Sequence, residues 1–346
     1  MNKEKRHIGW LMSSMLMLLL TACSSESAKG PNQQEELEDL NIELRAVTRT
    51  GLAEDDYDSE KKNIHVFLKA SDDPQIVQGM FKYHQEEDLH YWTAQDLKVK
   101  PGTREFSLFG YMPASEGLTG TIDTENCKLT LTGINPMTTS DICVVTGVNK
   151  SEVVSQPLRG SYTFDYINST YNERTILNLR LEHLLGRLVF KFKVGMKYSA
   201  LRKIKIKSLR IETEVPASIT ATVYLPMLTD DVIKVNYTGE GDNMTWSSNL
   251  LTEADPSVWL STTPVQVGHN INVAVGGGLS DQYKLVSTYE VYDLQDHFLS
   301  ERTASNKLNE VMPVKSQVKE VVLTIEPTYL YQLGDDDLNN PEVTIQ

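Results

Sequence analysis

The chain has 346 residues, of which 40% are hydrophobic, and a formal net charge of −14. An acidic surface repels phosphate backbones, so this composition argues against binding to nucleic acid. The length suggests about two domains, each large enough to bury a core of its own.

The first 22 residues have the layout of a removable export signal. Lys3, Lys5 and Arg6 give a basic start, and the mostly apolar segment 8–20 follows. That segment is too short for a helix across a hydrocarbon layer about 30 Å thick. We therefore expect cleavage, which removes three basic side chains and one acidic one and leaves the mature chain still more acidic.

The end of this segment resembles the lipobox of bacterial lipoproteins, in the sequence Leu20-Thr21-Ala22-Cys23. The resemblance implies that lipid is attached to Cys23 and that the chain is cut before it. Several acyl chains anchor a protein firmly to a membrane. Ser24 stands where an aspartate would resemble the inner-membrane retention signal, which favours the outer membrane. The alternative is an ordinary signal peptide with a chance cysteine.

The next segment, 24–39, is rich in Ser, Gln and Glu and lacks apolar periodicity, so it predicts a tether. Leu40, Ile42 and Leu44 then alternate with polar residues, as in a short half-buried strand. Arg45 and Arg49 follow in a threonine-rich junction.

From residue 64 onward the dominant period is two, which predicts an all-β body. The clearest strand is 187–194, where Leu188, Phe190, Phe192 and Val194 share one face. The other predicted strands are 64–68, 106–109, 142–145, 204–211, 219–225, 232–237, 271–275, 283–292 and 321–325.

Three irregularities punctuate this pattern. The apolar phase changes from even at Ile206 to odd at Leu209, which predicts a β-bulge. Residues 238–243 and the triple glycine 276–278 predict turns. Segment 178–185 has room for one or two helical turns.

Four features occur together in this chain: the lipobox, segment 91–93 followed by 106–113, segment 183–190 and the acidic tail 330–341. In these features the chain resembles the fimbrillin family, whose members are subunits of the type V pili of anaerobic gut and oral bacteria. The resemblance implies two transthyretin-like β-sandwich domains in tandem. The predicted division of the chain is a signal peptide at 1–22, a tether and first strand at 23–45, and two sandwich domains at 46–182 and 183–346. Family members commonly have alanine where Gly186 stands.

The resemblance also implies a route of assembly. Lipid-anchored precursors reach the cell surface and an arginine-specific protease removes the first strand. The strand of another fimbrial subunit then fills the groove. The expected location is therefore the outer membrane, through the lipid on Cys23, and the fimbrium.

The residues themselves fit this route. Leu40, Ile42 and Leu44 form a detachable strand, and burying each such side chain is worth about 1.5–3 kcal/mol. We predict cleavage after Arg45, with Arg49 as the second choice, since exposed junctions are where proteases cut. An exposed sheet edge recruits another strand. The candidate donor residues are Val321, Leu323, Ile325, Val343 and Ile345. The alternative is that both segments are ordinary edge strands of a monomer.

No motif for enzymatic or metal chemistry stands out. The triple glycine lacks a following Gly-Lys-Ser/Thr, and no Gly-x-Ser-x-Gly elbow occurs. His84 and His90 flank acidic residues at a spacing that favours a solvated hairpin over a metal site. We expect His183 to be a packed histidine and Arg187 an interface arginine. For Cys127 and Cys143 we favour two separate cysteines over a disulfide. We accordingly predict no catalytic residue, cofactor or metal ligand.

Two further functional classes stay open. A solitary surface lipoprotein could bind glycan or a host ligand through exposed aromatics such as Trp92, Trp246 and Trp259, although tryptophans are more often core residues. A hydrolase would need a pair of carboxylates that are close only in space.

Overall fold

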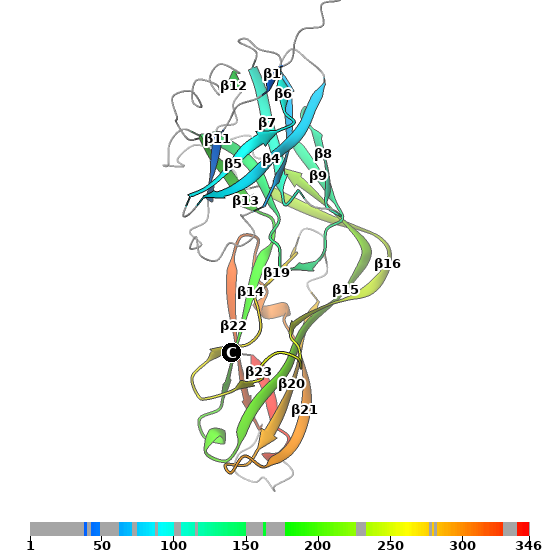
Figure 1. Ribbon diagram of the computed structural model, residues 1–346. Coiled ribbons are helices and arrows are strands. Elements are labelled where there is room, and N and C mark those ends of the chain that lie inside the picture. Colours follow the sequence, from blue (N-terminus) through cyan, green and yellow to red (C-terminus); the bar gives the residue numbers. More distant parts are fainter. Residues whose placement is uncertain are drawn as a thin grey trace, which may run out of the picture. The chain divides into compact units, whose positions relative to one another are not determined.

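The structure is a computed structural model (Figure 1). It describes residues 38–39, 43–48, 62–70, 75–86, 89–99, 105–114, 117–149, 162–163, 177–225, 233–276, 279, 282–327 and 338–345. Residues Glu38–Gln346 belong to one compact unit. The predicted signal peptide, Cys23, Arg49 and the acidic run 335–337 lie outside the described residues.

The described chain is built almost entirely of strands, which confirms the predicted all-β sandwich class. Its first sheet has eight strands, in the order β11-β13-β2-β5-β4-β3-β7-β12, and β11 also pairs with β7. Their bounds are β2 Glu43–Thr48, β3 Ile64–Ala70, β4 Ile76–Glu86, β5 Leu89–Gln95, β7 Glu105–Met112, β11 Cys143–Asn149, β12 Tyr162–Thr163 and β13 Leu177–His183. The β11–β7 pairing closes this sheet on itself, and apolar side chains such as Phe81 and Trp92 fill its interior. β1 Glu38–Asp39 and β6 Lys98–Val99 form a separate two-stranded antiparallel sheet.

The second sheet has seven strands and is organised by one very long strand, β15. Its order is β21-β20-β15-β9-β8, and β16 and β17 also pair with β15. The bounds are β8 Thr119–Asp123, β9 Lys128–Thr132, β15 Lys203–Tyr224, β16 Lys234–Leu251, β17 Val258–Trp259, β20 Tyr283–Tyr292 and β21 Phe298–Lys307. The first half of β15 pairs with β20 and its second half with β9.

The third sheet has six strands, in the order β10-β19-β14-β22-β23, with β18 also on β14. The bounds are β10 Met137–Thr138, β14 Gly186–Val194, β18 Val265–Gln266, β19 Ile271–Val273, β22 Val318–Glu326 and β23 Glu342–Ile345. Two short 3-10 helices, η3 Tyr198–Ala200 and η4 Asn309–Val311, lie in the connections.

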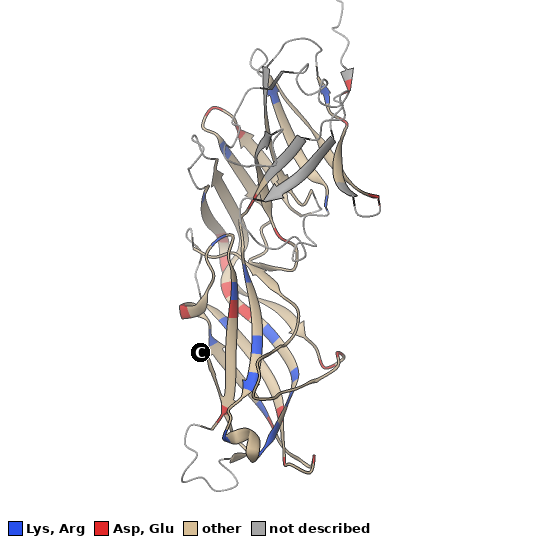
Figure 2. Ribbon diagram, turned by 90° about the vertical axis from the view of Figure 1, so that its left-hand side faces the viewer, with Lys and Arg blue, Asp and Glu red and all other residues tan. Residues whose placement is uncertain are grey.

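The alternation predicted for 187–194 is confirmed in β14. Leu188, Phe190, Phe192 and Val194 are all buried in a core that the first half of β15 and β20 complete from the opposite sheet. The other side of β14 carries lysines, and Lys191 Nζ lies 2.6 Å from Glu320 Oε1 on the neighbouring β22. On this solvated face a lysine of β14 thus pairs with a glutamate of β22, and basic and acidic positions lie on neighbouring strands (Figure 2).

A third core lies between the closed sheet and the second half of β15. Phe67 and Val144 from the closed sheet pack there with Leu131, Ala221 and Val223. Residues of the predicted C-terminal segment thus share a core with the predicted N-terminal segment. The domain boundary at 182/183 stays a prediction.

The predicted bulge is confirmed, because the register of β15 against β20 shifts between Ile206 and Ser208. Another prediction is wrong, because residues 238–243 are not a turn but lie within β16. Segment 178–185, which has room for one or two helical turns, lies largely in β13.

The glycines of 238–243 lie at a β-bulge and not at a turn that reverses the chain. The register of β15 against β16 shifts between Pro216 and Ser218, opposite this segment. Gly241 has a φ of +86°. A Cβ at Gly239 would lie 2.2 Å from the ring of Pro216. Because proline lacks an N–H, its place in a strand is at such a bulge, and glycine allows the close approach.

No helix among the described residues is long and apolar enough to cross a membrane.

Candidate functional site: a buried Asp–Cys–His cluster

The most chemically distinctive group of side chains is Asp141, Cys143 and His183. Asp141 lies two residues before Cys143, the first residue of β11, and His183 is the last residue of β13. Cys143 and His183 are register partners in the antiparallel β11–β13 pair. Directly opposed residues of such a pair point to the same face, so the pairing itself brings the thiol to the imidazole.

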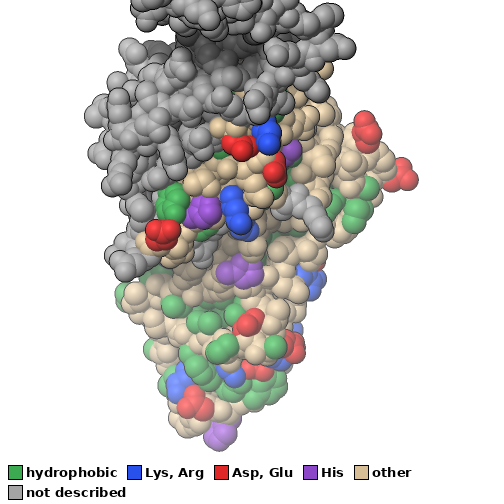
Figure 3. Space-filling model, turned by 45° about the horizontal axis from the view of Figure 1, so that its top comes forward, with side chains coloured by type: hydrophobic (Ala, Val, Ile, Leu, Met, Phe, Trp, Pro, Cys, Tyr) green, Lys and Arg blue, Asp and Glu red, His purple; other side chains and the backbone are tan. Residues whose placement is uncertain are grey.

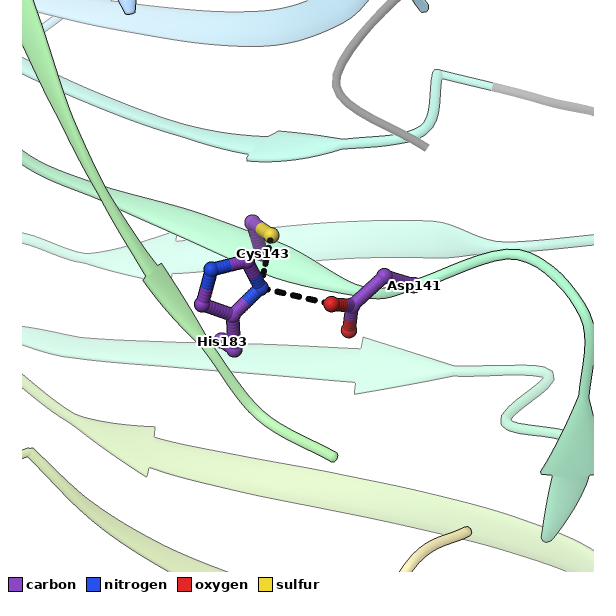
Figure 4. Close-up of side chains that lie close together, drawn as sticks. All are labelled: Asp141, Cys143 and His183. Carbon is purple, nitrogen blue, oxygen red and sulfur yellow. Dashed lines mark hydrogen bonds and ion pairs between the residues drawn. The ribbon is translucent and has the colours of Figure 1, made fainter. Parts of the chain in front are cut away.

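Both contacts of the cluster converge on one ring nitrogen (Figure 4). His183 Nδ1 lies 3.1 Å from Cys143 Sγ and 2.6 Å from Asp141 Oδ2. The relative exposures of Cys143, His183 and Asp141 are 0%, 2% and 4%. The three side chains are therefore enclosed within the protein.

This geometry does not suit nucleophilic catalysis. In a Cys–His–Asp relay, one ring nitrogen takes the proton of the thiol while the other donates to the carboxylate. Here thiol and carboxylate meet the same nitrogen, and burial closes the thiol to substrate. Asp, Cys and His are, however, three of the residue types that bind zinc in proteins.

The cluster is surrounded by long-range polar contacts. The His183 carbonyl accepts a bond from Ser316 Oγ at 2.9 Å, and Lys315 Nζ lies 2.8 Å from Glu182 Oε1. Nearby, Arg187 Nε donates to Asn272 Oδ1 at 2.9 Å. These bonds join the β13–β14 connection to segments more than eighty residues away.

Tyr237 provides a further contact in this region. Its hydroxyl donates to the carbonyl of Leu184 at 3.2 Å. Burial, and secondarily the negative charge of Asp141, raises the pKa of Tyr237 far above its ordinary value. The tyrosine is therefore a neutral donor at every physiological pH.

His183, the predicted packed histidine, and Arg187, the predicted interface arginine, are both buried. The contacts of His183 with Cys143 and Asp141 are not among the predictions. The antiparallel pairing of 143–149 with 177–183 brings these residues together, and no local sequence pattern signals that pairing. Cys127 and Cys143 form no disulfide, so the favoured interpretation of two separate cysteines is confirmed.

The predicted detachable strand is placed in part. Leu44 and Arg45 lie in β2, which begins at Glu43 and continues to Thr48, so Arg45 is inside a strand rather than after one. Leu40, Ile42 and Arg49 lie outside the described residues.

The predicted donor residues fall on two adjacent strands. Val321, Leu323 and Ile325 of β22 are at most 1% exposed, and β22 lies between β14 and β23. Val343 is also buried and Ile345 is half-buried, but their strand β23 is the last in its sheet.

The three candidate glycan-binding tryptophans differ in exposure. Trp92 is 2% exposed and donates to the Lys62 carbonyl, and Trp246 is half-buried. Trp259 is 48% exposed and packs on Tyr292, with 5.0 Å between ring centroids. The surface of the part that carries β20 and β21 shows further hydrophobic side chains among charged ones (Figure 3).

The histidine-containing acidic run forms a hairpin, as expected. β4 and β5 pair up to Glu86 and Leu89, and His84 stacks on Tyr91 with 5.1 Å between centroids. His84 Nε2 also lies 2.8 Å from Thr93 Oγ1.

Comparison with known proteins gives matches among solved structures only. No protein-family profile matches the chain, and no curated protein sequence matches it. One similar structure is a fimbrial protein from Bacteroides vulgatus, with 12% identity and a TM-score of 0.43, covering 89% of this chain and 98% of that one. Another is a candidate cell-adhesion protein from Bacteroides uniformis, with 14% identity and a TM-score of 0.39, covering 89% and 99%. A third is the fimbrial anchor protein Mfa2 from Porphyromonas gingivalis, with 9% identity and a TM-score of 0.34, covering 88% and 96%. These three solved structures are described as fimbrial or cell-adhesion proteins.

Proposed function

We propose that this chain is a structural and adhesive subunit of a bacterial fimbria, exported as a lipoprotein and assembled by strand exchange. The observation that carries the proposal is the position of β2. β2 is the first strand of the closed sheet in chain order. It runs parallel to β13, whereas the other pairings of that sheet are antiparallel.

The pairing of β2 is suited to replacement. It has five register pairs with β13, from Leu44↔Leu177 to Thr48↔Leu181, and two with β5. Removing β2 would open the sheet between β13 and β5 and leave two unpaired edges facing each other. Such edges bind an added strand through main-chain hydrogen bonds. A strand supplied by a second subunit would close the sheet again and join the two subunits.

The bounds of β2 favour one of the two candidate cleavage sites. Cleavage after Arg45 would leave Ala46–Thr48 paired with β13. Cleavage after Arg49 would release all of β2. We therefore place the productive cut at Arg49, the second of the two sites that the sequence suggests, and assign it to an arginine-specific protease at the cell surface.

The donor is best assigned to β23 rather than to β22. Withdrawing β22 would separate it from β14, with which it has eight register pairs, and would expose Val321, Leu323 and Ile325. Withdrawing β23 breaks four register pairs at a sheet edge. Val343 and Ile345 would then supply the apolar positions of the donated strand.

Cys23 provides the anchor in this proposal. Lipid on its sulfur and amine would hold the precursor at the outer membrane until cleavage after Arg49 frees the folded body. Cleavage therefore couples release from the membrane to opening of the groove. An anchoring subunit would instead keep its lipid and its first strand.

The test compares Arg49→Ala with Arg45→Ala in cells, with surface-extracted protein analysed by N-terminal sequencing and on an unboiled gel. We expect the unaltered chain and Arg45→Ala to begin at Thr50 and to give a ladder of oligomers. Arg49→Ala should keep its lipidated N-terminus and give a single band. An intact N-terminus within polymers of the unaltered chain would contradict assembly after cleavage.

The exposed aromatics favour a second candidate function, a surface protein that binds glycan or another host ligand. Trp259, Tyr292 and Phe298 form consecutive ring contacts, with centroids 5.0 and 5.9 Å apart, and Lys205 Nζ lies 5.6 Å from the Trp259 ring. Sugar rings stack on exposed aromatic faces and bond to flanking charges. Loss of glycan-array binding in Trp259→Ala, with retention in the exposed control Met196→Ala, would support this function. An unaltered protein that binds no glycan of a broad array would retire it.

A further inference from the structure

Among the described residues, one group of three side chains brings together atoms that can ligate a metal. These are a carboxylate oxygen of Asp141, the sulfur of Cys143 and a ring nitrogen of His183, all within 4.8 Å of one another. His183 lies 40 residues after Cys143 and 42 after Asp141, and the β11–β13 register places Cys143 directly opposite His183. We propose that this cluster is a structural zinc site.

The hydrogen-bonding capacity of His183 is the first argument. A ring nitrogen either carries a proton and donates once or is bare and accepts once. Nδ1 faces Cys143 Sγ at 3.1 Å and Asp141 Oδ2 at 2.6 Å. A protonated Nδ1 can donate to the carboxylate, and a bare Nδ1 can accept from the thiol. Neither protonation state makes a good hydrogen bond at both contacts. A zinc ion between the three atoms takes the lone pair of the nitrogen, the thiolate and the carboxylate together.

The carboxylate of Asp141 supplies the second argument. It is 4% exposed, and its Oδ1 accepts no hydrogen bond within the described part of the chain. A buried carboxylate without sufficient partners carries a large desolvation cost. A divalent cation would offset that cost and would give Oδ1 a role, since a carboxylate can bind zinc through both oxygens.

The mixture of donors selects the metal. Calcium and magnesium prefer oxygen ligands only, whereas zinc accepts sulfur, nitrogen and oxygen in one tetrahedral site. Zinc bonds of about 2.0–2.3 Å place tetrahedral ligand atoms about 3.3–3.6 Å apart. The present 2.6 and 3.1 Å separations are somewhat shorter, so small side-chain rotations away from the centre would admit the ion. Asp141 Oδ1 or a water molecule would occupy the fourth position.

The consequence of binding would be a crosslink between the start of β11 and the end of β13. β13 is the direct neighbour of β2 in this sheet, and β11 is the neighbour of β13 on its other side. A ligand that binds only the folded state stabilises it. The zinc ion would therefore keep this edge of the closed sheet in register.

The experiment uses the full-length protein, expressed with added zinc and dialysed into metal-free buffer. We expect about one zinc ion per chain by mass spectrometry of the metal, as for a closed site. Replacement by Co²⁺ should give a thiolate-to-cobalt charge-transfer band, because Cys143 is the proposed sulfur ligand. The matched control is Cys127→Ser, which removes a cysteine outside the cluster and should leave both results unchanged.

The variants Cys143→Ser and His183→Asn should lose the metal, and Cys143→Ser should lose the cobalt band. Unaltered protein with less than about a tenth of a zinc ion per chain and no cobalt band would overturn the proposal, whether or not the variants fold. Retention of the band in Cys143→Ser would do the same. In either event the cluster would be a hydrogen-bonded Asp–His pair with an adjacent thiol.

Discussion

At the scale of single residues, Gly186 shows how closely β14 approaches the connection before β22. A Cβ at this position would lie 2.6 Å from Pro313 Cγ and 2.8 Å from the carbonyl oxygen of Val314. Since a backbone carbonyl and a proline ring yield little, Gly186→Ala should lower the free energy of unfolding by about 1–3 kcal/mol, as overpacking usually does. Denaturant unfolding checks this. Unchanged or higher stability would show that the connection moves freely.

His65 provides a prediction about pH. Burial lowers the pKa of its imidazole, and a hydrogen bond with Gln78 opposes the shift. The folded state therefore binds its proton less readily than the unfolded state, whose histidine pKa is about 6.5. Stability contributed by neutral His65 should be present above this value and lost as the pH falls below it.

The measurement is thermal unfolding of the unaltered chain and of His65→Gln between about pH 7.5 and pH 5. The unaltered chain should lose more stability than the variant over this range. Equal slopes would show that the imidazole is protonated as readily in the folded state as in the unfolded state. The variant also loses the stack of His65 on Tyr111, so the comparison depends on the slope and not on the absolute stability.

The Asp141–Cys143–His183 cluster marks the limit of prediction for a site. Each residue is ordinary in its own sequence context, and forty residues separate Cys143 from His183. Only the register of β11 against β13 brings them together. Residue type and local spacing therefore predicted a packed histidine but could not predict what it contacts.

At the scale of elements, alternation predicted strands well because each strand buries one face. It predicted β14 and β20 almost to the residue and found the bulge near Ser208. It failed at 238–243, because glycine permits both a turn and a bulge. What decides between them is the partner strand, here the segment around Pro216.

The tail before and within β23 gives a prediction at this scale. Three hydroxyl groups donate to its backbone: Tyr198 to the Leu338 carbonyl at 2.6 Å, Ser300 to Asn339 at 2.6 Å and Tyr289 to Pro341 at 2.7 Å. Burial raises the pKa of Tyr289 to about 12, so it remains a donor at neutral pH. These bonds hold the proposed donor strand on its own subunit.

Tyr289→Phe leaves the Pro341 carbonyl without this donor and should cost about 1–3 kcal/mol locally. The expected result is faster amide hydrogen exchange in 338–345 than in the unaltered chain, with little change in β20. The control is Tyr292→Phe, whose hydroxyl bonds to Glu290 and not to the tail. Equal exchange in the tail of both variants would show that the Tyr289 bond does not restrain it.

At the scale of the whole chain, period-two patterning predicted the class but not how the sheets share strands. The second half of β15 pairs with β9 and packs against the closed sheet, while its first half packs against β14 and β22. Apolar and polar residues alternate in both halves of β15. The sequence pattern of 203–224 therefore does not show that the two halves pack in different cores. The division at 182/183 was inferred from length and from the clear strand that follows.

The buried and exposed positions of β23 allow its proposed role as donor strand to be tested. If this strand fills the groove left by β2 in another subunit, its buried position matters more than its exposed ones. Val343 is 7% exposed and Thr344 is exposed. A charge at residue 343 would have to enter an apolar groove, whereas a charge at 344 would stay in water.

We therefore expect Val343→Asp to abolish the ladder on unboiled gels of surface extracts, and Thr344→Asp to retain it. Because Val343 also packs in the core of its own subunit, the Val343→Asp monomer must be checked for export and for cooperative unfolding. Exported, folded and protease-cleaved Val343→Asp that still gives a full ladder would exclude β23 as the donor. If neither the unaltered chain nor Thr344→Asp forms a ladder while β2 is retained, the monomeric alternative follows, because the seated β2 leaves no open groove for a second subunit to fill.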